Sequence, residues 1–331
     1  TFACGAFSAA SGSSAACAAT MARVCVPEMD RYKYDRSFAA AVVAAGGTLD
    51  ILIPPSINMV IYAQITDVSI GKMFMAGIVP GVLAVGVYSA VIWAVVKLNP
   101  GLARRGDKYP VAEMIRSLKG MVPVLILFAV VMGGIYTGVF TPTEAGGLGA
   151  FAAFVMVILA RRMNWKVVTT CMMDTGRTTS MVFLLIVGGM IFAYFMTLSR
   201  LPSNVGNLVL GLNVPPTIVI MVIILIFLVL GTFMNVVGMM LLTVPVVFPV
   251  VMALHYDPIW FGIIVVRLSE IAMLSPPVAM NVFIVSATTN EPVDRVYRKV
   301  IPFIIGDVAS LVFLVAFPEI SLLLPRLMYE K

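Results

Sequence analysis

Long apolar runs separated by short polar stretches dominate the chain, and some runs contain residues that helices avoid. At about 20 residues per crossing, the apolar runs suffice for roughly ten membrane-crossing or re-entrant helical segments. One run is broken at 46–56, where two glycines and an acid precede the pair Pro54-Pro55. Such a sequence cannot continue an α-helix. In hydrocarbon, a break persists only where it is buried in protein or lines a cavity, so this segment predicts a site.

Clusters of small polar residues inside apolar runs predict two re-entrant hairpin tips. The first cluster is Ser11–Ser14, within the run 1–26, and the second is Gly231–Asn235, between the runs 217–230 and 236–251. Close packing of small-residue helices is the alternative interpretation of the first cluster.

The same pattern predicts the remaining elements. Full crossings are expected at 72–98, 121–140, 145–160, 180–198 and 300–324, and a second broken segment at 259–287. Polar loops are expected at 27–36, 99–119 and 161–177, and a Pro/Gly/Asn-rich linker at 199–216.

The unusual positions recur after a shift of 222 residues. Pro27 then falls on Pro249, Tyr34-Asp35 on Tyr256-Asp257, Pro54-Pro55 on Pro276-Pro277 and Pro80 on Pro302. The basic residues change sides between the copies. Three lie in 27–36 and none in 249–258, whereas 66–72 carries one and 288–299 carries three. Because basic loops face the cytoplasm, the copies are expected to be inverted in the membrane. Inverted repeats with broken helices are typical of secondary transporters.

Composition supports a polytopic all-α membrane protein with inverted repeats. Of the 331 residues, 61% are apolar and only 11% are charged, and the mean hydropathy is +1.04. Soluble domains carry about a quarter charged residues. The net charge of +6 is spread over short loops, which argues against a nucleic-acid partner. Because the sequence offers no nucleophile–base pair, metal-ligand cysteine spacing or phosphate-binding loop, we expect neither an enzyme nor an ATP-driven pump.

The tips and breaks supply ligands for a hard cation. Hydroxyl, carboxylate and backbone carbonyl oxygens suit a desolvated Na⁺ ion. The expected Na⁺ ligands are Ser11, Ser13, Ser14, Asp50, Ile53 and Pro55 in the first copy, and Thr232, Asn235 and Ser275 in the second. Apart from Na⁺ as a coupling ion, no cofactor is expected.

Asp50 and Arg267 are charges at membrane depth, and such charges are functional hypotheses by default. Arg267 could bind a substrate carboxylate, pair with Glu270 one turn away, or pair with Asp50 across the site. We expect Glu270 to hydrogen-bond backbone at the second break rather than to move protons.

Several motifs in order along the whole chain resemble those of the large membrane subunit (M, DctM-like) of tripartite ATP-independent periplasmic (TRAP) transporters. They are GSS at the first tip, AAGGTLDILIPPS, SIGKMFMAGIVPG, FTPTEA, LLTVPVVFPVV, DPIWFGIIVV and EIAMLSPPVAMN. The resemblance implies an elevator-type, Na⁺-coupled importer of small organic acids in the bacterial inner membrane. It also implies two partners: a small four-helix membrane (Q) subunit and a periplasmic binding protein that delivers the substrate.

Carried over position by position, the resemblance assigns an ion and substrate site. Its residues are Ser11, Gly12, Ser13, Ser14, Gly46, Gly47, Thr48, Asp50, Ile53, Pro54, Pro55, Gly231, Thr232, Asn235, Glu270, Ser275, Pro276 and Pro277. Arg267 is added to the expected site as a charge at membrane depth rather than by the resemblance. It also divides the chain into the first repeat (1–98), a loop with scaffold helices and a linker (99–215), the second hairpin and broken helix (216–299), and a C-terminal helix (300–331). Scaffold helices are expected to precede residue 1.

Three positions depart from the family pattern. Asp50 and Ala279 stand where glycine is usual, and Asn235 stands where an acid is common. Arg267 is also unusual for the family. Asp50 and Arg267 could compensate each other, or the substrate could be zwitterionic rather than a plain dicarboxylate. The alternative function is a Na⁺/dicarboxylate symporter that works without a binding protein.

Overall fold

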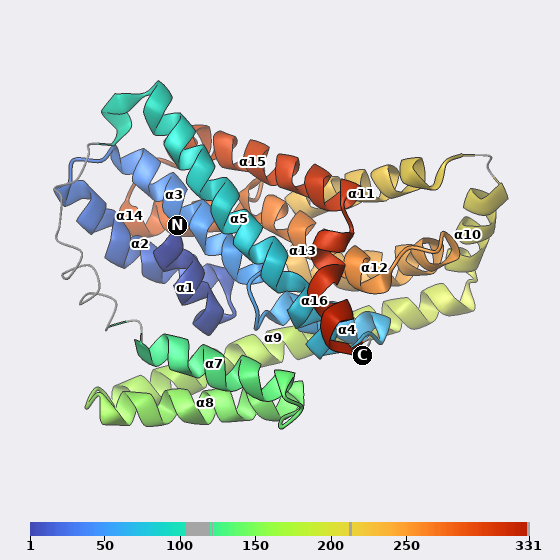
Figure 1. The fold of residues 1–331 in the computed structure, drawn as a ribbon, viewed down its shortest axis with the longest axis horizontal. Coiled ribbons are helices and arrows are strands. Elements are labelled where there is room, and N and C mark those ends of the chain that lie inside the picture. Colours follow the sequence, from blue (N-terminus) through green and yellow to red (C-terminus); the bar gives the residue numbers. More distant parts are fainter. Residues whose placement is uncertain (104–119, 121, 212–213, 330–331) are drawn as a thin grey trace.

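The fold is built from α-helices and short 3-10 turns, as a computed structural model shows for residues 1–103, 120, 122–211 and 214–329 (Figure 1). Six helices in these ranges are long and apolar enough to cross a membrane. They are α5 (Ile70–Leu98), α8 (Pro142–Leu159), α9 (Trp165–Leu198), α11 (Pro216–Phe233), α12 (Val236–Ala253) and α15 (Val293–Ala316). The predicted all-α polytopic architecture is confirmed.

Two helical hairpins lie where the polar clusters predict them. In the first, α1 (Phe2–Ser11) and α2 (Ser14–Arg31) are joined at Gly12, whose φ of 62° is left-handed and favours glycine. In the second, α11 and α12 are joined by Met234 and Asn235, and the Asn235 side chain accepts a hydrogen bond from the amide of Val237. This bond caps α12 and defines where the helix begins.

Each hairpin is followed by a broken helix. The first consists of α3 (Arg36–Thr48), the 3-10 turn η1 (Leu49–Ile51) and α4 (Ile57–Thr66). The second consists of α13 (Pro258–Leu274) and α14 (Met280–Thr289). The segment between the halves contains a double proline with a cis bond in both cases.

The first break starts later than predicted, because Gly46 and Gly47 still belong to α3. Their role is close packing. A Cβ atom on Gly47 would lie 2.9 Å from the Cβ atom of Ala18 in α2, and one on Gly46 would lie 2.7 Å from the Cys4 sulfur in α1. The two glycines therefore allow the hairpin to approach the broken helix closely.

The backbone repeats with the same shift of 222 residues. The shift places the bounds of α2 on those of α12. It also places Lys33 on His255, both of which have positive φ, and the helix cap Asp35 on the helix cap Asp257. The arm helices α5 and α15 contact each other and run in opposite directions along the long axis (Figure 1).

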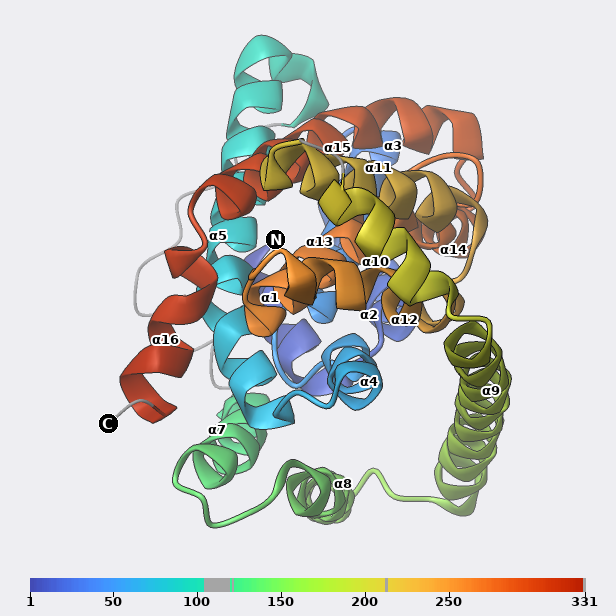
Figure 2. The same cartoon turned by 90° about the vertical axis from the view of Figure 1, so that its right-hand side faces the viewer.

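Contacts between the copies close the structure. The hairpin helix α2 packs on α14, and its counterpart α12 packs on α4. At the centre lies α13, in which every residue from Trp260 to Leu274 is buried (Figure 2). A helix buried on all sides carries apolar residues around its whole circumference, and most of α13 fits that rule. Arg267 and Glu270 are its two charged exceptions.

The remaining helices lie around this body. One side is flanked by α7 (Val122–Tyr136), α8 and α9, and α10 (Leu201–Gly211) joins α9 to the second hairpin (Figures 1 and 2). The short turn η2 (Pro100–Leu102) follows α5, and the C-terminal helix α16 (Glu319–Tyr329) packs on α5.

Several predicted boundaries are wrong because helices extend into polar sequence. The loop predicted at 27–36 shrinks because α2 continues through Pro27 to Arg31. The loop predicted at 161–177 ends early, since α9 begins at Trp165 and includes Lys166 and Arg177. Polarity alone does not end a helix whose backbone bonds remain satisfied.

Two further predicted elements, at 199–216 and 300–324, differ from the structure. The linker predicted at 199–216 contains α10, and the crossing predicted at 300–324 ends at Ala316, before α16 begins. From residue 104 on, the basic loop predicted at 99–119 lies outside the described residues.

We expect Gly47→Ala to lower the stability of the protein by about 1–3 kcal/mol, because the new methyl group would press on the backbone of α2. The measurement is the unfolding temperature in detergent. Gly86→Ala in α5 is the matched control, since no atom lies within 4 Å of its added Cβ and alanine favours helix. Equal unfolding temperatures for the two variants would contradict the close approach of α2 and α3.

Candidate functional site

The first hairpin tip lies directly against the first break. The Ser11 hydroxyl donates a 2.7 Å hydrogen bond to the Asp50 carboxylate. A Cβ atom on Gly12 would lie 3.6 Å from the carbonyl oxygen of Pro55. Asp50 is 1% exposed, so its charge is held in the interior by the tip.

Some of the carbonyl groups freed by the first break are satisfied locally. The Ser56 hydroxyl donates a 2.6 Å hydrogen bond to the Ile51 carbonyl, and the Ile53 amide donates to the Leu49 carbonyl at 2.9 Å. Among the hydrogen bonds described, none ends on the carbonyl oxygens of Ile53 or Pro55. These oxygens remain available as ligands.

The second tip contacts the second break in a corresponding way. The Val278 amide donates a 3.3 Å hydrogen bond to the carbonyl oxygen of Thr232. A Cβ atom on Gly231 would lie 2.7 Å from the Cβ atom of Ala272. The hydroxyl of Thr232 donates to the Val229 carbonyl and that of Ser275 to the Ile271 carbonyl, which leaves both hydroxyl oxygens with acceptor capacity.

A cavity of about 340 Å³ joins both tips to both breaks. The first residues of four helices line it: Ser14 of α2, Ile57 of α4, Val236 of α12 and Met280 of α14. The tip residues Gly12, Ser13, Gly231, Met234 and Asn235 line it too, together with Asn58 and with Thr178 of α9. The site is therefore shared by the two repeats and closed on one side by α9.

The two repeats also touch within this cavity. The hydroxyl of Ser14, at the first tip, lies 3.0 Å from the sulfur of Met273 in the second broken helix. Ala272 and Met273 line the cavity beside it. The first tip therefore contacts both breaks.

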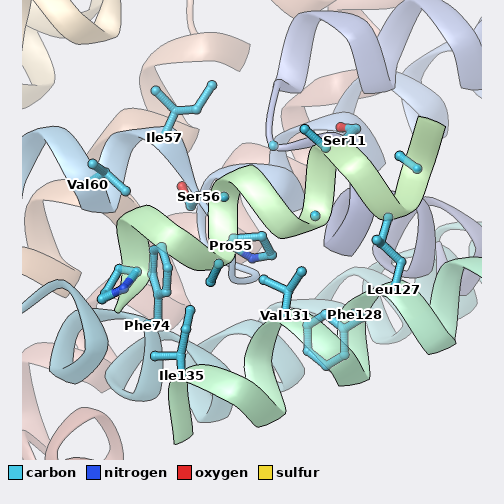
Figure 3. Close-up of a pocket in the computed structure, with 17 residues that line it drawn as sticks. Ser11, Pro55, Ser56, Ile57, Val60, Phe74, Leu127, Phe128, Val131 and Ile135 are labelled. Atoms are coloured by element: carbon cyan, nitrogen blue, oxygen red, sulfur yellow. The ribbon is translucent and has the colours of Figure 1, made fainter. Parts of the chain in front are cut away.

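A second cavity, of about 460 Å³, lies on the other side of the first tip. Figure 3 shows Ser11, Pro55 and Ser56 on one side of it, facing Val131 and Ile135 of α7. Apart from the tip and break, its lining is largely apolar. The polar groups of the first tip are thus separated from α7 and α8 by a space rather than by close packing.

Arg267 bonds to side chains in the core of the protein, and it does not line the shared cavity. It pairs with Glu270 and, at 2.6 Å, with Asp307 of α15, and its Nε atom donates a 2.9 Å bond to the Ser310 hydroxyl. All three charged side chains are fully buried, and none lines either cavity. Pairing with Glu270 is confirmed, and pairing with Asp50 is wrong.

The expectation that Glu270 bonds backbone at the break is also wrong, since its side chain bonds Arg267. Asp307 was missed by the sequence reasoning. Asp307 is the only acid in 300–318, within the last predicted crossing. An acid at membrane depth is itself a sign of a functional or paired residue, so the sequence did offer a signal for it.

Comparison with known proteins decides the family. A family model described as "Tripartite ATP-independent periplasmic transporter, DctM component" matches residues 1–320. The chain belongs to this family. The predicted resemblance to the large TRAP subunit is therefore confirmed.

The names of three relatives of this DctM-family chain specify different substrates. The C4-dicarboxylate TRAP transporter large permease protein DctM of Pseudomonas aeruginosa is 36% identical over 98% of this chain and 76% of its own length. The isethionate TRAP transporter permease protein DctMQ of Oleidesulfovibrio alaskensis is 32% identical over 96% of this chain and 50% of its own. The sialic acid TRAP transporter large permease protein SiaM of Vibrio cholerae is 30% identical over 97% of this chain and 75% of its own.

Five of the predicted site residues line the shared cavity of this DctM-family chain: Gly12, Ser13, Ser14, Gly231 and Asn235. Ser11 and Pro55 line the second cavity instead, and the other predicted residues line neither. Thr48 points away from the cavities and bonds Tyr88, and Gly46 and Gly47 pack inside the body. Asn58 and Thr178 line the shared cavity and were not predicted. A polar residue directly after Ile57, at the start of a half-helix, was the available signal for Asn58.

We expect the stability effects of Asp50→Asn and Arg267→Gln to add to within about 0.5 kcal/mol, because the two side chains share no partner. Arg267→Gln and Asp307→Asn should instead couple by about 0.5–3 kcal/mol, since these groups pair directly. Unfolding of the single and double variants in detergent measures both couplings. A strong coupling between Asp50 and Arg267 would contradict the arrangement described here.

Proposed function

We propose that this DctM-family chain imports a small organic acid by secondary active transport coupled to Na⁺. The observation that carries the proposal is the shared cavity, where the N-terminal ends of α2, α4, α12 and α14 meet. Helix N-termini carry partial positive charge and unbonded amides, which favour an anion. In inverted-repeat transporters, such half-helix ends bind the substrate near the membrane midplane.

The lining supports a carboxylate or a related anion as the substrate. The side chains of the cap residues Ser13, Ser56 and Ala279 make no capping hydrogen bond, so the first-turn amides of α2, α4 and α14 are free of side-chain acceptors. Among the described residues, no charged side chain lines the cavity, and its volume of about 340 Å³ lies in the range of small-molecule sites. The substrates named for the three relatives are also anions.

Na⁺ is the proposed coupling ion, and the donor set supports it. In the first copy, the Asp50 carboxylate, the Ser11 hydroxyl and the carbonyl oxygen of Pro55 are hard oxygen ligands close to the tip. The carbonyl oxygen of Ile53 is a further proposed ligand. Further ligands are proposed from Ser13, Ser14, Thr232, Asn235 and Ser275. A cation beside Asp50 would offset its charge, which otherwise repels an anion entering the neighbouring cavity.

An elevator-type movement is the proposed route for alternating access. The hairpins and broken helices form one interlocked body, whereas α7, α8 and α9 lie on its outside (Figure 2). A third cavity, apolar and of about 530 Å³, is lined by α4, α9 and α12, although α9 also contacts α12 directly at Gly189 and Leu241. The cavity in Figure 3 likewise lies between the first tip and α7. Apolar cavities at this boundary, together with its lack of ion pairs among the described residues, would favour movement of the body past the peripheral helices.

The proposed partners are a small membrane (Q) subunit and a periplasmic binding protein (P), with the bacterial inner membrane as the location. The tripartite description of the family supports both partners. The name DctMQ of one relative supports a Q subunit, since this chain matches half of that longer protein.

Uptake into proteoliposomes tests the proposal. The chain is reconstituted with its Q subunit, and labelled C4-dicarboxylates, isethionate and sialic acid are offered with and without the binding protein and an inward Na⁺ gradient. We expect uptake of one of these anions only when both are present. Uptake with Na⁺ but without the binding protein would support the dicarboxylate symporter instead, and uptake indifferent to both would refute the proposed function.

We expect Asn58→Asp to weaken uptake at least tenfold. The substitution preserves shape and suits the start of α4, but it adds a negative charge to the cavity. Two like charges about 6 Å apart repel by about 3 kcal/mol at an effective dielectric constant of about 20. The measurement is the KM of the transported anion.

Asn164→Asp is the matched control. It makes the same change at the exposed start of α9, where the Asn164 side chain accepts a hydrogen bond from the Val167 amide. If both variants changed KM equally, the shared cavity would not be the anion site.

A further inference from the structure

A chain of buried polar groups crosses the core apart from both cavities. The Thr48 hydroxyl of α3 lies 3.0 Å from the Tyr88 hydroxyl of α5, which donates a 2.9 Å bond to Asp307 of α15. Asp307 accepts a 2.6 Å bond from Arg267, which also bonds Glu270, both in α13. All five side chains are fully buried. This row of polar groups therefore connects the first break, both arm helices and the second broken helix.

The charges in this cluster do not balance. Arg267 contributes one positive charge, while Glu270 and Asp307 contribute two negative charges when both are ionised. The cluster would then carry a net charge of −1 in a buried, membrane-embedded core. An unbalanced charge in such a place is costly, and a buried ion cluster is stable only when its charges are compensated.

No other described residue supplies the missing charge. The groups that interact electrostatically with Glu270 are Arg267, Asp307 and Tyr88, of which Arg267 is the cation. Asp50 of η1 is bonded to the first tip instead. The charged residues on the other helices packed against α13 are all at least partly exposed: Arg36, Lys72, Lys97, Asp294, Arg295, Arg298, Lys299, Glu319 and Arg326. On those helices Tyr62, Tyr297 and Tyr329 are the other titratable groups, and the first two donate to backbone carbonyl oxygens.

A metal cation does not fit as the compensating charge. None of the four main cavities in the described part of the chain is lined by Arg267, Glu270 or Asp307. A hard cation needs a space surrounded by several oxygen ligands. A proton needs no such space.

One oxygen atom is free to bind that proton. Asp307 accepts hydrogen bonds at both carboxylate oxygens, from Arg267 and from Tyr88. Glu270 accepts one from Arg267 at Oε2, but its buried Oε1 atom has no partner among the described residues. A proton can attach to Oε1 without breaking any existing bond.

We propose that Glu270 binds one exchangeable proton, which makes the cluster of Arg267, Glu270 and Asp307 neutral. Loss of this proton leaves a net negative charge in α13, less than one turn from Ala272 and Met273 in the wall of the shared cavity. Proton release should therefore oppose the binding of an anionic substrate. The site is a proton site distinct from the proposed Na⁺ ligands at the tips.

Infrared spectroscopy of the purified full chain in lipid tests the proposal, independently of transport. A protonated carboxyl group has a C=O stretching band that a carboxylate lacks. We expect such a band in the wild type at neutral pH and its loss in Glu270→Gln, which mimics the protonated side chain and keeps an acceptor for Arg267. Glu319→Gln is the matched control on exposed α16 and should retain the band.

Asp307→Asn provides an independent second variant. It removes one of the two negative charges, so the remaining pair is already neutral and Glu270 should stay ionised. We therefore expect the Glu270 band to disappear in this variant although Glu270 is still present. A band from Asp50, the other buried acid, would persist in both variants.

Three results would overturn the proposal. The first is the absence of a wild-type band that Glu270→Gln removes, and the second is retention of that band in Asp307→Asn. The third is a band that Glu270→Gln removes but that appears in the wild type only after Na⁺ is withdrawn. The last result would mean that a metal cation balances the cluster. Because none of these measurements uses uptake, they can fail while the proposed transport function stands.

Discussion

The lack of water in a lipid bilayer is the constraint on which this structure depends. A backbone group without a partner costs several kcal/mol there, so a helix can stop only where other protein groups cover its ends. The first break meets this requirement through its own residues and the first hairpin tip, as the bonds of Ser56 to Ile51 and of Ser11 to Asp50 show. The second does so through the contact between Val278 and Thr232. Covering the breaks and building the site are one and the same arrangement.

Repetition turns two covered breaks into one site. Because the hairpin of each copy packs on the broken helix of the other, four helix N-termini come to line a single cavity. A single copy would supply two of these ends. The polarity of the cavity thus comes from backbone rather than from charged side chains, which suits a family whose named substrates range from C4-dicarboxylates to sialic acid.

The charged residues at membrane depth fall into two separate environments. Asp50 belongs to the first tip, where it accepts a bond from Ser11. Arg267 belongs to the core of the body, where Glu270 and Asp307 hold it from two helices. The two charges that depart from the family pattern therefore do not compensate each other directly. Each adds a separate electrostatic feature to the same fold.

The sequence by itself determined the breaks, the tips and the repeat, because prolines, glycines and long apolar runs act locally on the backbone. It also determined the family. Only the tertiary structure decided which charges meet. Arg267 could have paired with Glu270, Asp50 or a substrate. It pairs with Glu270 and also with Asp307, 40 residues away, because α15 packs on α13. The role of Gly46 and Gly47 and the cavity position of Asn58 were decided in the same way, because contacts between distant helices leave no periodic signal in the sequence.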